Sequence, residues 1–342
     1  MIILSTKRIG RQTVVLQNPP SIIGHACVVG KKEGEGPLSD SFDHINEDSY
    51  FGEATWEKAE VAMQKHALSL ALNKASIPPS KVEYSFGGDL LNQCISSAYA
   101  MRDSNIPFFG LFGACSTMSE SLILASMLID GGFADISAAV TSSHFCSAER
   151  QFRFPLEYGG QRPPTSQWTV TGSGAMILSS SGTGPYITHL TPGKIVDAGI
   201  KDANNMGAAM APAAYDTLKT HFDDTGFPPT YYDLIVTGDL GSVGHSIILD
   251  FFKSDGIDLS AIYQDCGLMI YSVDQDVHAG GSGCGCSAAV LTGHILNGMR
   301  SGRWKRVLFA ATGALMSPTS TMQGESILGI CHAVTISIEK GG

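Results

Sequence analysis

Two stretches of the chain repeat one pattern of apolar and polar positions. In each, an apolar run typical of a buried strand ends in Gly-Asp-Leu, with YSFG before Gly88 and LIVT before Gly238. Farther on, each has a Cys-Ser pair at the start of an apolar helical segment, at Cys115 and at Cys286, followed by a second strand-like run, ISAAVT or VLFAAT. Because the order strand, helix, strand occurs twice, the pattern predicts a duplicated α/β protein.

Each half also begins with a segment that has small and apolar residues at helical spacing, residues 56–70 and residues 204–218. We therefore expect an N-terminal half of residues 1–184 and a C-terminal half of residues 185–342. Residues 146–184 have no evident counterpart in the second half and are interpreted as an excursion over the surface or over a pocket. Residues 31–48 are interpreted as a polar loop.

The composition is that of a globular protein with a large core: 342 residues, 43% hydrophobic and 16% charged. The formal net charge of -10 disfavours nucleic acid as a partner, because nucleic acid is itself a polyanion. The eight cysteines are scattered, which is typical of reduced intracellular thiols. No signal peptide is evident and no apolar run approaches the roughly 20 residues of a membrane helix. We therefore expect a soluble, cytosolic protein.

Cys115 is the candidate nucleophile. The stretch LFGACSTMSESL places it between an apolar run and a helix predicted over residues 116–129. Unpaired N–H groups and the macrodipole at a helix N-terminus favour a thiolate, which would lower the thiol pKa. Acyl transfer also needs a proton acceptor and donors for the oxyanion. A buried structural cysteine is the alternative for such a turn.

The duplicated pattern resembles the thiolase superfamily, and more narrowly its ketoacyl synthase III branch. The resemblance covers nearly all of the chain and includes GCGCSAA from Gly283, WTVTGSGAMIL from Trp168 and VLFAATGALMSP from Val307. It implies a thiolase-like duplicated five-layered αβαβα fold, usually dimeric. In that family Cys115 would match the acyl-accepting cysteine.

The chain departs from this family at the two partners of the cysteine. The family's His falls on Gly238 and its Asn falls on Gly285. Glycine supplies neither a proton acceptor nor a side-chain donor, so a decarboxylating condensation would lack the groups that stabilise its enolate. His245 and His144 are the candidate replacement bases, although His245 does not align with the vacated position.

A narrower resemblance is to the stage V sporulation protein AD family of spore-forming bacteria. It is carried by FGGDLLNQ, LFGACSTMSE, residues 142–174 and TGDLGSVGHSI. It implies a non-catalytic protein without a cofactor that binds dipicolinic acid, with or without calcium, and supports its uptake into the developing spore. It further implies a homodimer, membrane proteins of the same sporulation operon as partners, and a peripheral position on the cytoplasmic side of the spore inner membrane.

Dipicolinate is a flat pyridine with two carboxylates, so its pocket needs hydrogen-bond donors and an aromatic surface. Residues 146–184 supply candidates of both kinds: Arg150, Arg153, Arg162, Phe152, Phe154 and Tyr158. Arg153 is the leading candidate because it lies between two aromatic residues, whereas pairing with surface acids is the alternative for each arginine. His144 is expected near the pocket floor as a donor to the ligand, or else as an ordinary core histidine.

Two further residues belong to the Gly-Asp-Leu turns. Gln93 follows the first turn, and Asp239 lies in the second. Asp239 would repel a dianion, so it is predicted to orient a His or Arg, to ligate calcium arriving with the ligand, or to cap the next helix. With Cys115, Gly238 and Gly285 these residues complete the predicted ligand-binding set, and no resident metal site is predicted.

Three functions are thus open from the sequence. The first is a binding protein for dipicolinate. The second is an acyl-transfer or condensing enzyme that uses Cys115 with a non-standard base. The third is a scaffold with a vestigial pocket.

Overall fold

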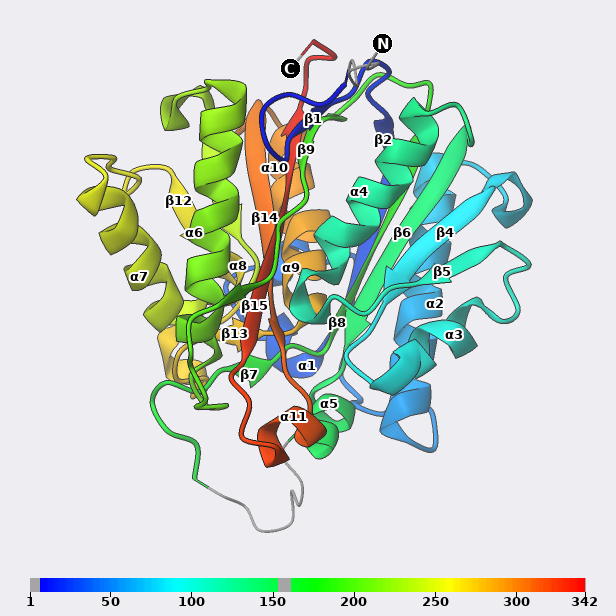
Figure 1. The fold of residues 1–342 in the computed structure, drawn as a ribbon. Coiled ribbons are helices and arrows are strands. Elements are labelled where there is room, and N and C mark those ends of the chain that lie inside the picture. Colours follow the sequence, from blue (N-terminus) through cyan, green and yellow to red (C-terminus); the bar gives the residue numbers. More distant parts are fainter. Residues whose placement is uncertain (1–6, 153–160, 342) are drawn as a thin grey trace.

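The computed structural model describes residues 7–152 and 161–341. In this part of the chain, two halves of a large mixed sheet alternate with helices to form five layers (Figure 1). The outer helices are α2 (Trp56–Ala75) and α3 (Ile95–Met101) on one side, and α6 (Met206–Thr225) and α7 (Gly241–Ser254) on the other. The central helices are α4 (Thr117–Asp130), α9 (Cys284–Ala289) and α10 (Leu296–Arg300). The expected five-layered α/β fold is confirmed.

The two halves of the sheet have the same strand order, β5-β4-β6-β8-β2 in the first and β12-β11-β14-β15-β9 in the second. In each half the first three strands run parallel, and the remaining neighbours run antiparallel. The first-half strands are β2 (Ser21–Gly30), β4 (Tyr84–Gly88), β5 (Phe108–Gly110), β6 (Ile136–Ser143) and β8 (Gly172–Ser179). The second-half strands are β9 (Tyr186–Thr191), β11 (Leu234–Thr237), β12 (Tyr263–Asp265), β14 (Arg306–Leu315) and β15 (Leu328–Ser337). The predicted boundary after residue 184 falls in the connection from β8 to β9.

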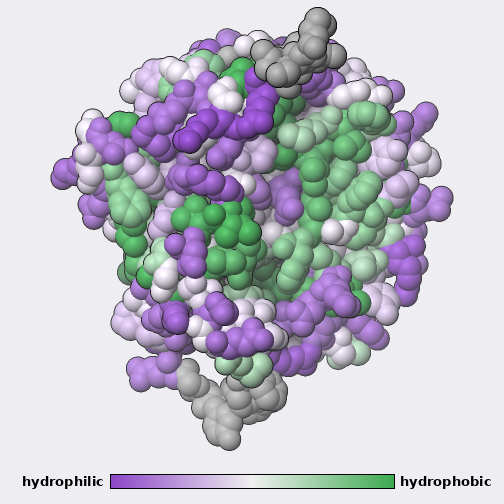
Figure 2. All heavy atoms as spheres, in the orientation of Figure 1, coloured by the Kyte–Doolittle hydropathy of each residue, from purple (hydrophilic) through white to green (hydrophobic). Residues whose placement is uncertain are grey.

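The surface in Figure 2 carries a continuous apolar area over the part of the molecule where α4, β4 and β5 lie in Figure 1. Strand β5 is at the end of the strand order, so one of its edges pairs with no strand in residues 7–152 and 161–341. Phe109 in β5 is 51% exposed and Phe112 just after it is 49% exposed. No helix in the described residues combines the length and the apolarity needed to cross a membrane.

The interpretation of residues 146–184 as an excursion over a pocket holds for part of this segment, since Ala148, Phe152 and Gln167 line a cavity, but it is wrong for residues 172–179. Residues 172–179 form β8, a fully buried strand that corresponds to β15 in the other half. A short helix precedes each of these strands, α5 (Phe145–Phe152) in the first half and α11 (Pro318–Met322) in the second. The two insertions differ in length and composition, so no common spacing marked them in the sequence. Residues 31–48 likewise contain α1 (Lys31–Gly34) and β3 (His44–Asn46), not a plain loop.

The two predicted outer helices are present, and local chemistry sets their ends. The Thr55 side chain accepts a hydrogen bond from the backbone N–H of Lys58 at the start of α2. At the start of α6, the Asn205 side chain accepts one from the backbone N–H of Ala208. At the other end, Ser76 and Gly226 adopt left-handed backbone angles, with φ of 56° and 70°. These signals are local in sequence, which is why the pattern located both helices.

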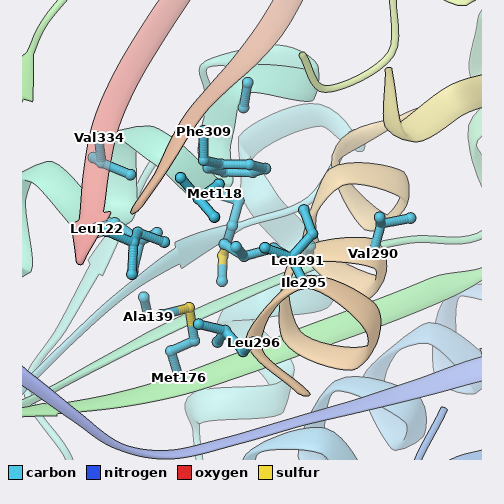
Figure 3. Close-up of a cluster of buried hydrophobic side chains, with 14 of the residues drawn as sticks. Met118, Leu122, Ala139, Met176, Val290, Leu291, Ile295, Leu296, Phe309 and Val334 are labelled. Carbon is cyan, nitrogen blue, oxygen red and sulfur yellow. The ribbon is translucent and has the colours of Figure 1, made fainter. Parts of the chain in front are cut away.

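The central layer holds the core that joins the halves. Figure 3 shows side chains of α4, β8, β14 and the helical segment after α9 packed together. Met118, Leu122, Met176, Leu291 and Phe309 are all fully buried there. Because close packing leaves little freedom to such side chains, this core holds the first turn of α4 in place. The 3₁₀ turn that contains Cys115 lies immediately before it.

Candidate functional site

Cys115 lies in the 3₁₀ turn Ala114–Ser116 that leads directly into α4. Ala114 has a φ of 50°, a left-handed conformation that residues with a side chain rarely adopt. The Ser116 hydroxyl donates to the carbonyl of Gly113 at 2.7 Å and holds the turn. Strained backbone of this kind is concentrated at functional sites.

A cavity of about 300 Å³ is lined by Cys115 and by residues of both halves of the chain. Its apolar lining includes Leu90, Phe112, Ala148, Phe152, Met206 and Leu315. Its polar lining consists of Glu149, Gln167, Thr169, Asn204, Ser282 and Ser317. Among the described residues, the lining contains no Lys, Arg or His. The volume is at the lower end of the range for small-molecule sites.

Asp239 lies close to Cys115, and its charge raises the pKa of the thiol. The carboxylate accepts hydrogen bonds from the Thr312 hydroxyl at 2.8 Å, the Ser282 hydroxyl at 3.1 Å and the Gly283 backbone N–H at 2.9 Å. Burial raises the pKa of Asp239 above its usual value, and these hydrogen bonds oppose that shift. The arrangement ties Asp239 to β14 and to the start of α9.

Cys115 is a protonated thiol in this environment. Burial, and then the charge of Asp239, raise the pKa of the thiol well above its usual value. The helix N-terminus is worth only about 0.3–1 kcal/mol to an anion, so burial and the adjacent acid outweigh it. The prediction that this helix lowers the thiol pKa is therefore wrong.

Asp265, and not Asp239, caps α7. Its carboxylate accepts from the backbone N–H groups of Leu240 at 2.8 Å and Gly241 at 3.0 Å, and from the Thr237 hydroxyl at 2.7 Å. Burial raises the pKa of Asp265 to about 7. The predicted capping role of Asp239 is thus corrected, because the cap comes from the neighbouring strand β12.

Gly238 and Gly285, the glycines that the sequence resemblance matched to the family's His and Asn, do not line the cavity. Both lie in closely packed surroundings. A Cβ atom on Gly285 would lie 2.6 Å from the hydroxyl oxygen and 2.8 Å from the backbone nitrogen of Ser143, and closer still to the carbonyl oxygen of Gly172. A Cβ atom on Gly238 would lie 3.0 Å from the backbone nitrogen of Thr312. Backbone segments occupy the space that a family His or Asn would need.

The two candidate histidines lie outside the cavity lining. His144 is buried, its Nε2 is 2.8 Å from the carbonyl oxygen of Ser49, and burial lowers its pKa. His245 on α7 stacks on Tyr263 with ring centroids 4.6 Å apart, and burial lowers its pKa as well. His144 therefore does not lie at the pocket floor, where the sequence had placed it.

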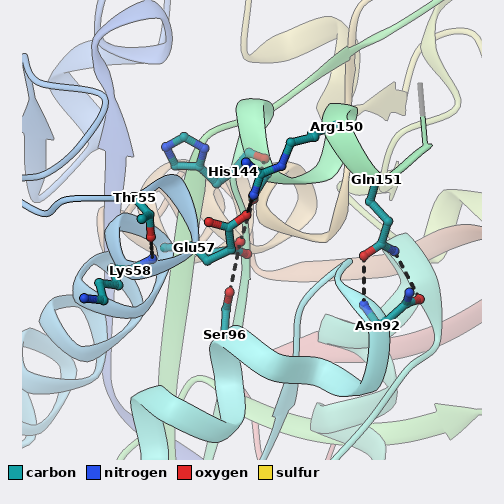
Figure 4. A network of polar contacts seen from close by, with 10 residues as sticks. Thr55, Glu57, Lys58, Asn92, Ser96, His144, Arg150 and Gln151 are labelled. Atoms are coloured by element: carbon teal, nitrogen blue, oxygen red, sulfur yellow. Dashed lines mark hydrogen bonds and ion pairs between the residues drawn. The ribbon is translucent and has the colours of Figure 1, made fainter. Parts of the chain in front are cut away.

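Gln93 and Arg150 line a different, open hollow on the surface. Figure 4 shows Arg150 directed at Glu57, with which it forms an ion pair, and Gln151 bonded to Asn92. The structure thus brings Gln93 and Arg150 together, but away from the cavity next to Cys115. For Arg150, the surface ion pair considered from the sequence is observed.

Of the remaining predicted residues, the structure describes Arg162 alone. Arg153, Phe154 and Tyr158 lie outside the described residues. Arg162 donates to the backbone carbonyl of Gln167 and lies over the Trp168 ring, 4.7 Å from its centroid.

Sequence reasoning predicted none of the six polar residues of the lining, and Glu149 and Gln167 are among those it missed. Glu149 is 6% exposed and accepts a hydrogen bond from the Thr169 hydroxyl at 3.0 Å. Gln167 is 2% exposed and donates to two backbone carbonyls. Nothing in the local pattern separates a buried Glu or Gln from the exposed polar residues of the same loop. The described residues contain no group of three or more His, Cys, Asp or Glu side chains that could hold a metal ion.

Replacing Asp239 with asparagine should make Cys115 more reactive. The change removes the charge that raises the thiol pKa while nearly preserving the side-chain shape, and each pKa unit removed raises the thiolate fraction about tenfold. The measurement is the rate of iodoacetamide labelling at Cys115, followed by peptide mass spectrometry. Asp265→Asn is the matched control and should leave that rate unchanged. An unchanged rate in Asp239→Asn would contradict the assignment of Asp239 as the neighbour of the thiol.

Comparison with known proteins agrees with the geometry. The family model described as stage V sporulation protein AD matches residues 10–337. Stage V sporulation protein AD of Bacillus subtilis (strain 168) is 46% identical over 336 residues, which cover 98% of this chain and 99% of that protein.

Among solved structures, 3-oxoacyl-[acyl-carrier-protein] synthase III from Aquifex aeolicus VF5 is 14% identical with a TM-score of 0.55, over 93% of this chain and 99% of that one. A variant of Xanthomonas campestris OleA is 15% identical with a TM-score of 0.61, over 96% of this chain and 99% of that one. At these identities the likeness concerns the fold, which is thiolase-like. The sequence matches go further: the chain belongs to the stage V sporulation protein AD family.

Proposed function

We propose that this protein is a non-catalytic binding protein of sporulation that holds dipicolinic acid in the cavity next to Cys115 and supports its uptake into the developing spore. The observation that carries the proposal is the state of Cys115. Burial and the nearby Asp239 raise the pKa of the thiol, so the thiol is protonated, and the described lining of the cavity contains no histidine. A cysteine nucleophile needs a thiolate or a base, so these surroundings favour holding a ligand over attacking one.

The cavity has features that suit a small flat acid. Phe112 and Phe152 provide aromatic walls, and Asn204 and Ser317 provide hydrogen-bonding groups. A volume of about 300 Å³ leaves room for a single-ring compound but little more. The family membership supplies the sporulation setting in which dipicolinic acid is the expected ligand.

The proposal includes a homodimer, membrane proteins of the same operon as partners, and a peripheral position at the spore inner membrane. One edge of β5 pairs with no strand of the described residues, and Phe109 on β5 is exposed; both features support a second copy of the chain as an occupant of that face. Sedimentation velocity that gives only a monomer would remove the dimer from the proposal.

Calorimetric titration of the purified chain with dipicolinate tests the central claim. We expect saturable binding of one ligand per chain, and much weaker binding of benzene-1,3-dicarboxylate, which lacks the ring nitrogen. Absence of heat and of saturation with dipicolinate would end the proposal.

The enzyme alternative is tested on the same sample. After incubation with a short acyl-CoA, the intact mass should be unchanged in both the wild type and Cys115→Ser. An acyl adduct in the wild type that is missing in Cys115→Ser would show that Cys115 is still a nucleophile.

A further inference from the structure

Gln167, in the loop just before β7 (Trp168–Thr169), carries a buried acceptor that no described residue satisfies. Its Nε2 donates to the carbonyl oxygens of Asp239 at 2.7 Å and Gly281 at 2.8 Å. Both N–H bonds are thereby used, and this fixes which way the amide is turned. Its Oε1 is buried and receives no hydrogen bond from the described residues. Since Gln167 belongs to the cavity lining, the missing donor can come from a ligand.

The charged groups around Gln167 are mostly acids. Asp239, after β11, is held through its carbonyl by the Gln167 amide, and Glu149 on α5 shares the cavity lining. Asp265, at the end of β12, accepts from the backbone of Gly241, the residue that packs against the Gln167 amide. Arg162 is bonded to the Gln167 backbone carbonyl but is not part of the lining.

The thiol of Cys115 is itself only a weak hydrogen-bond donor. The described part of the lining therefore combines an unused acceptor, Gln167 Oε1, with the carboxyl group of Glu149. A ligand that brings only acceptors would leave Gln167 Oε1 unsatisfied.

We infer that the cavity selects a ligand that donates a hydrogen bond to Gln167 Oε1, so that a pyridine dicarboxylate is bound with one carboxyl group protonated. The inference rests on the proposed function and specifies the protonation state of its ligand. The dianion takes one proton from the solvent on binding, and the new O–H group donates to Oε1. The second carboxylate keeps its charge, and Gln167 is the residue that determines this specificity.

Two ligands separate this inference from its alternatives. Pyridine-2,6-dicarboxylate must acquire a proton to donate, whereas 6-carbamoylpyridine-2-carboxylate donates through its amide N–H at any pH. The ratio of their association constants cancels the titration of protein groups such as Asp265. As the pH rises above neutrality, we expect the association constant of the dicarboxylate to fall about tenfold per pH unit relative to that of the monoamide.

Calorimetry in phosphate and in Tris at one pH should also report uptake of about one proton per bound dicarboxylate and none for the monoamide. Gln167→Leu, checked for folding by circular dichroism, should remove the preference for the monoamide. The wild-type comparison does not depend on whether that variant folds.

The outcomes are distinct. Binding of the dicarboxylate without proton uptake, at a constant ratio to the monoamide across pH, overturns the inference and leaves the proposed function standing. Binding of neither compound overturns the proposed function and this inference with it.

Discussion

Raising the pH from about 5 to about 8.5 is expected to lower the free energy of unfolding of the wild type by several kcal/mol relative to variants that lack its buried carboxyl groups. The reason is a set of fully buried carboxyl groups. Burial raises the pKa of Asp265 to about 7, and burial together with the nearby Asp89 raises the pKa of Glu60. A carboxyl group whose pKa is higher in the folded state binds its proton more tightly there. Its stabilising contribution is complete below the unfolded pKa near 4 and is lost as the pH rises through the folded pKa.

For Asp265 alone, the two pH units between pH 5 and its folded pKa of about 7 correspond to a loss on the order of 3 kcal/mol. Glu60 acts in the same direction. It lies among hydroxyl donors, with the Ser142 and Ser147 hydroxyl oxygens each 3.0 Å from its carboxylate oxygens. These hydrogen bonds oppose the rise in pKa that burial causes, but they do not cancel it.

Urea unfolding of the purified chain at a series of pH values measures this effect. Asp265→Asn and Glu60→Gln should each flatten the dependence of stability on pH, because each removes one titrating group. Asp250, an exposed acid on α7, offers a matched control, and Asp250→Asn should leave the slope as it is. A difference in stability between the wild type and Asp265→Asn that stays constant over this window would show that Asp265 is not protonated in the folded protein.

Restoring the family asparagine by Gly285→Asn should destabilise the fold by at least about 3 kcal/mol rather than recover an enzyme. The new Cβ atom would overlap the carbonyl of Gly172 and the backbone of Ser143, and neither can move without shifting a strand. Overpacking of backbone against backbone offers no rotamer that relieves it. Thermal and urea unfolding are the measurements.

Two other glycines grade this prediction. Gly238→Ala should lower the free energy of unfolding less than Gly285→Asn does. Its Cβ atom would lie 3.0 Å from its nearest neighbour, and small shifts of the neighbouring atoms relieve such a contact. Gly110→Ala, whose Cβ atom would make only ordinary contacts beginning at 3.4 Å, should be nearly neutral. A stable Gly285→Asn variant that condenses acyl groups would refute the interpretation of this site as non-catalytic.

The duplicated Gly-Asp-Leu turns have been put to different uses. Asp89 accepts hydrogen bonds from the backbone N–H and the hydroxyl of Ser97, both at 2.7 Å, within its own half. Asp239 instead accepts hydrogen bonds from the Thr312 and Ser282 hydroxyls of its own half, and it raises the pKa of the Cys115 thiol in the other half. The motif therefore supports a helix in the first half, whereas its copy in the second half acts on the cysteine.

The sequence by itself determined the duplication, the α/β class, the family and the position of most strands and helices. YSFG, ISAAVT, LIVT and VLFAAT all lie in the strands they predicted, β4, β6, β11 and β14. The helix expected over residues 116–129 is α4, which runs from Thr117 to Asp130. Periodicity, caps and turns act over a few residues, so they can be read along the chain.

Only the tertiary structure decided the chemistry around Cys115. The thiol pKa depends on burial and on Asp239, which is more than a hundred positions away in the sequence. Glu149 and Gln167 have a role only because the fold places them in the lining of the cavity next to Cys115. The close packing of Gly285 arises from strands of the other half. Desolvation and contacts between distant segments come into being when the layers pack, and no local pattern contains them.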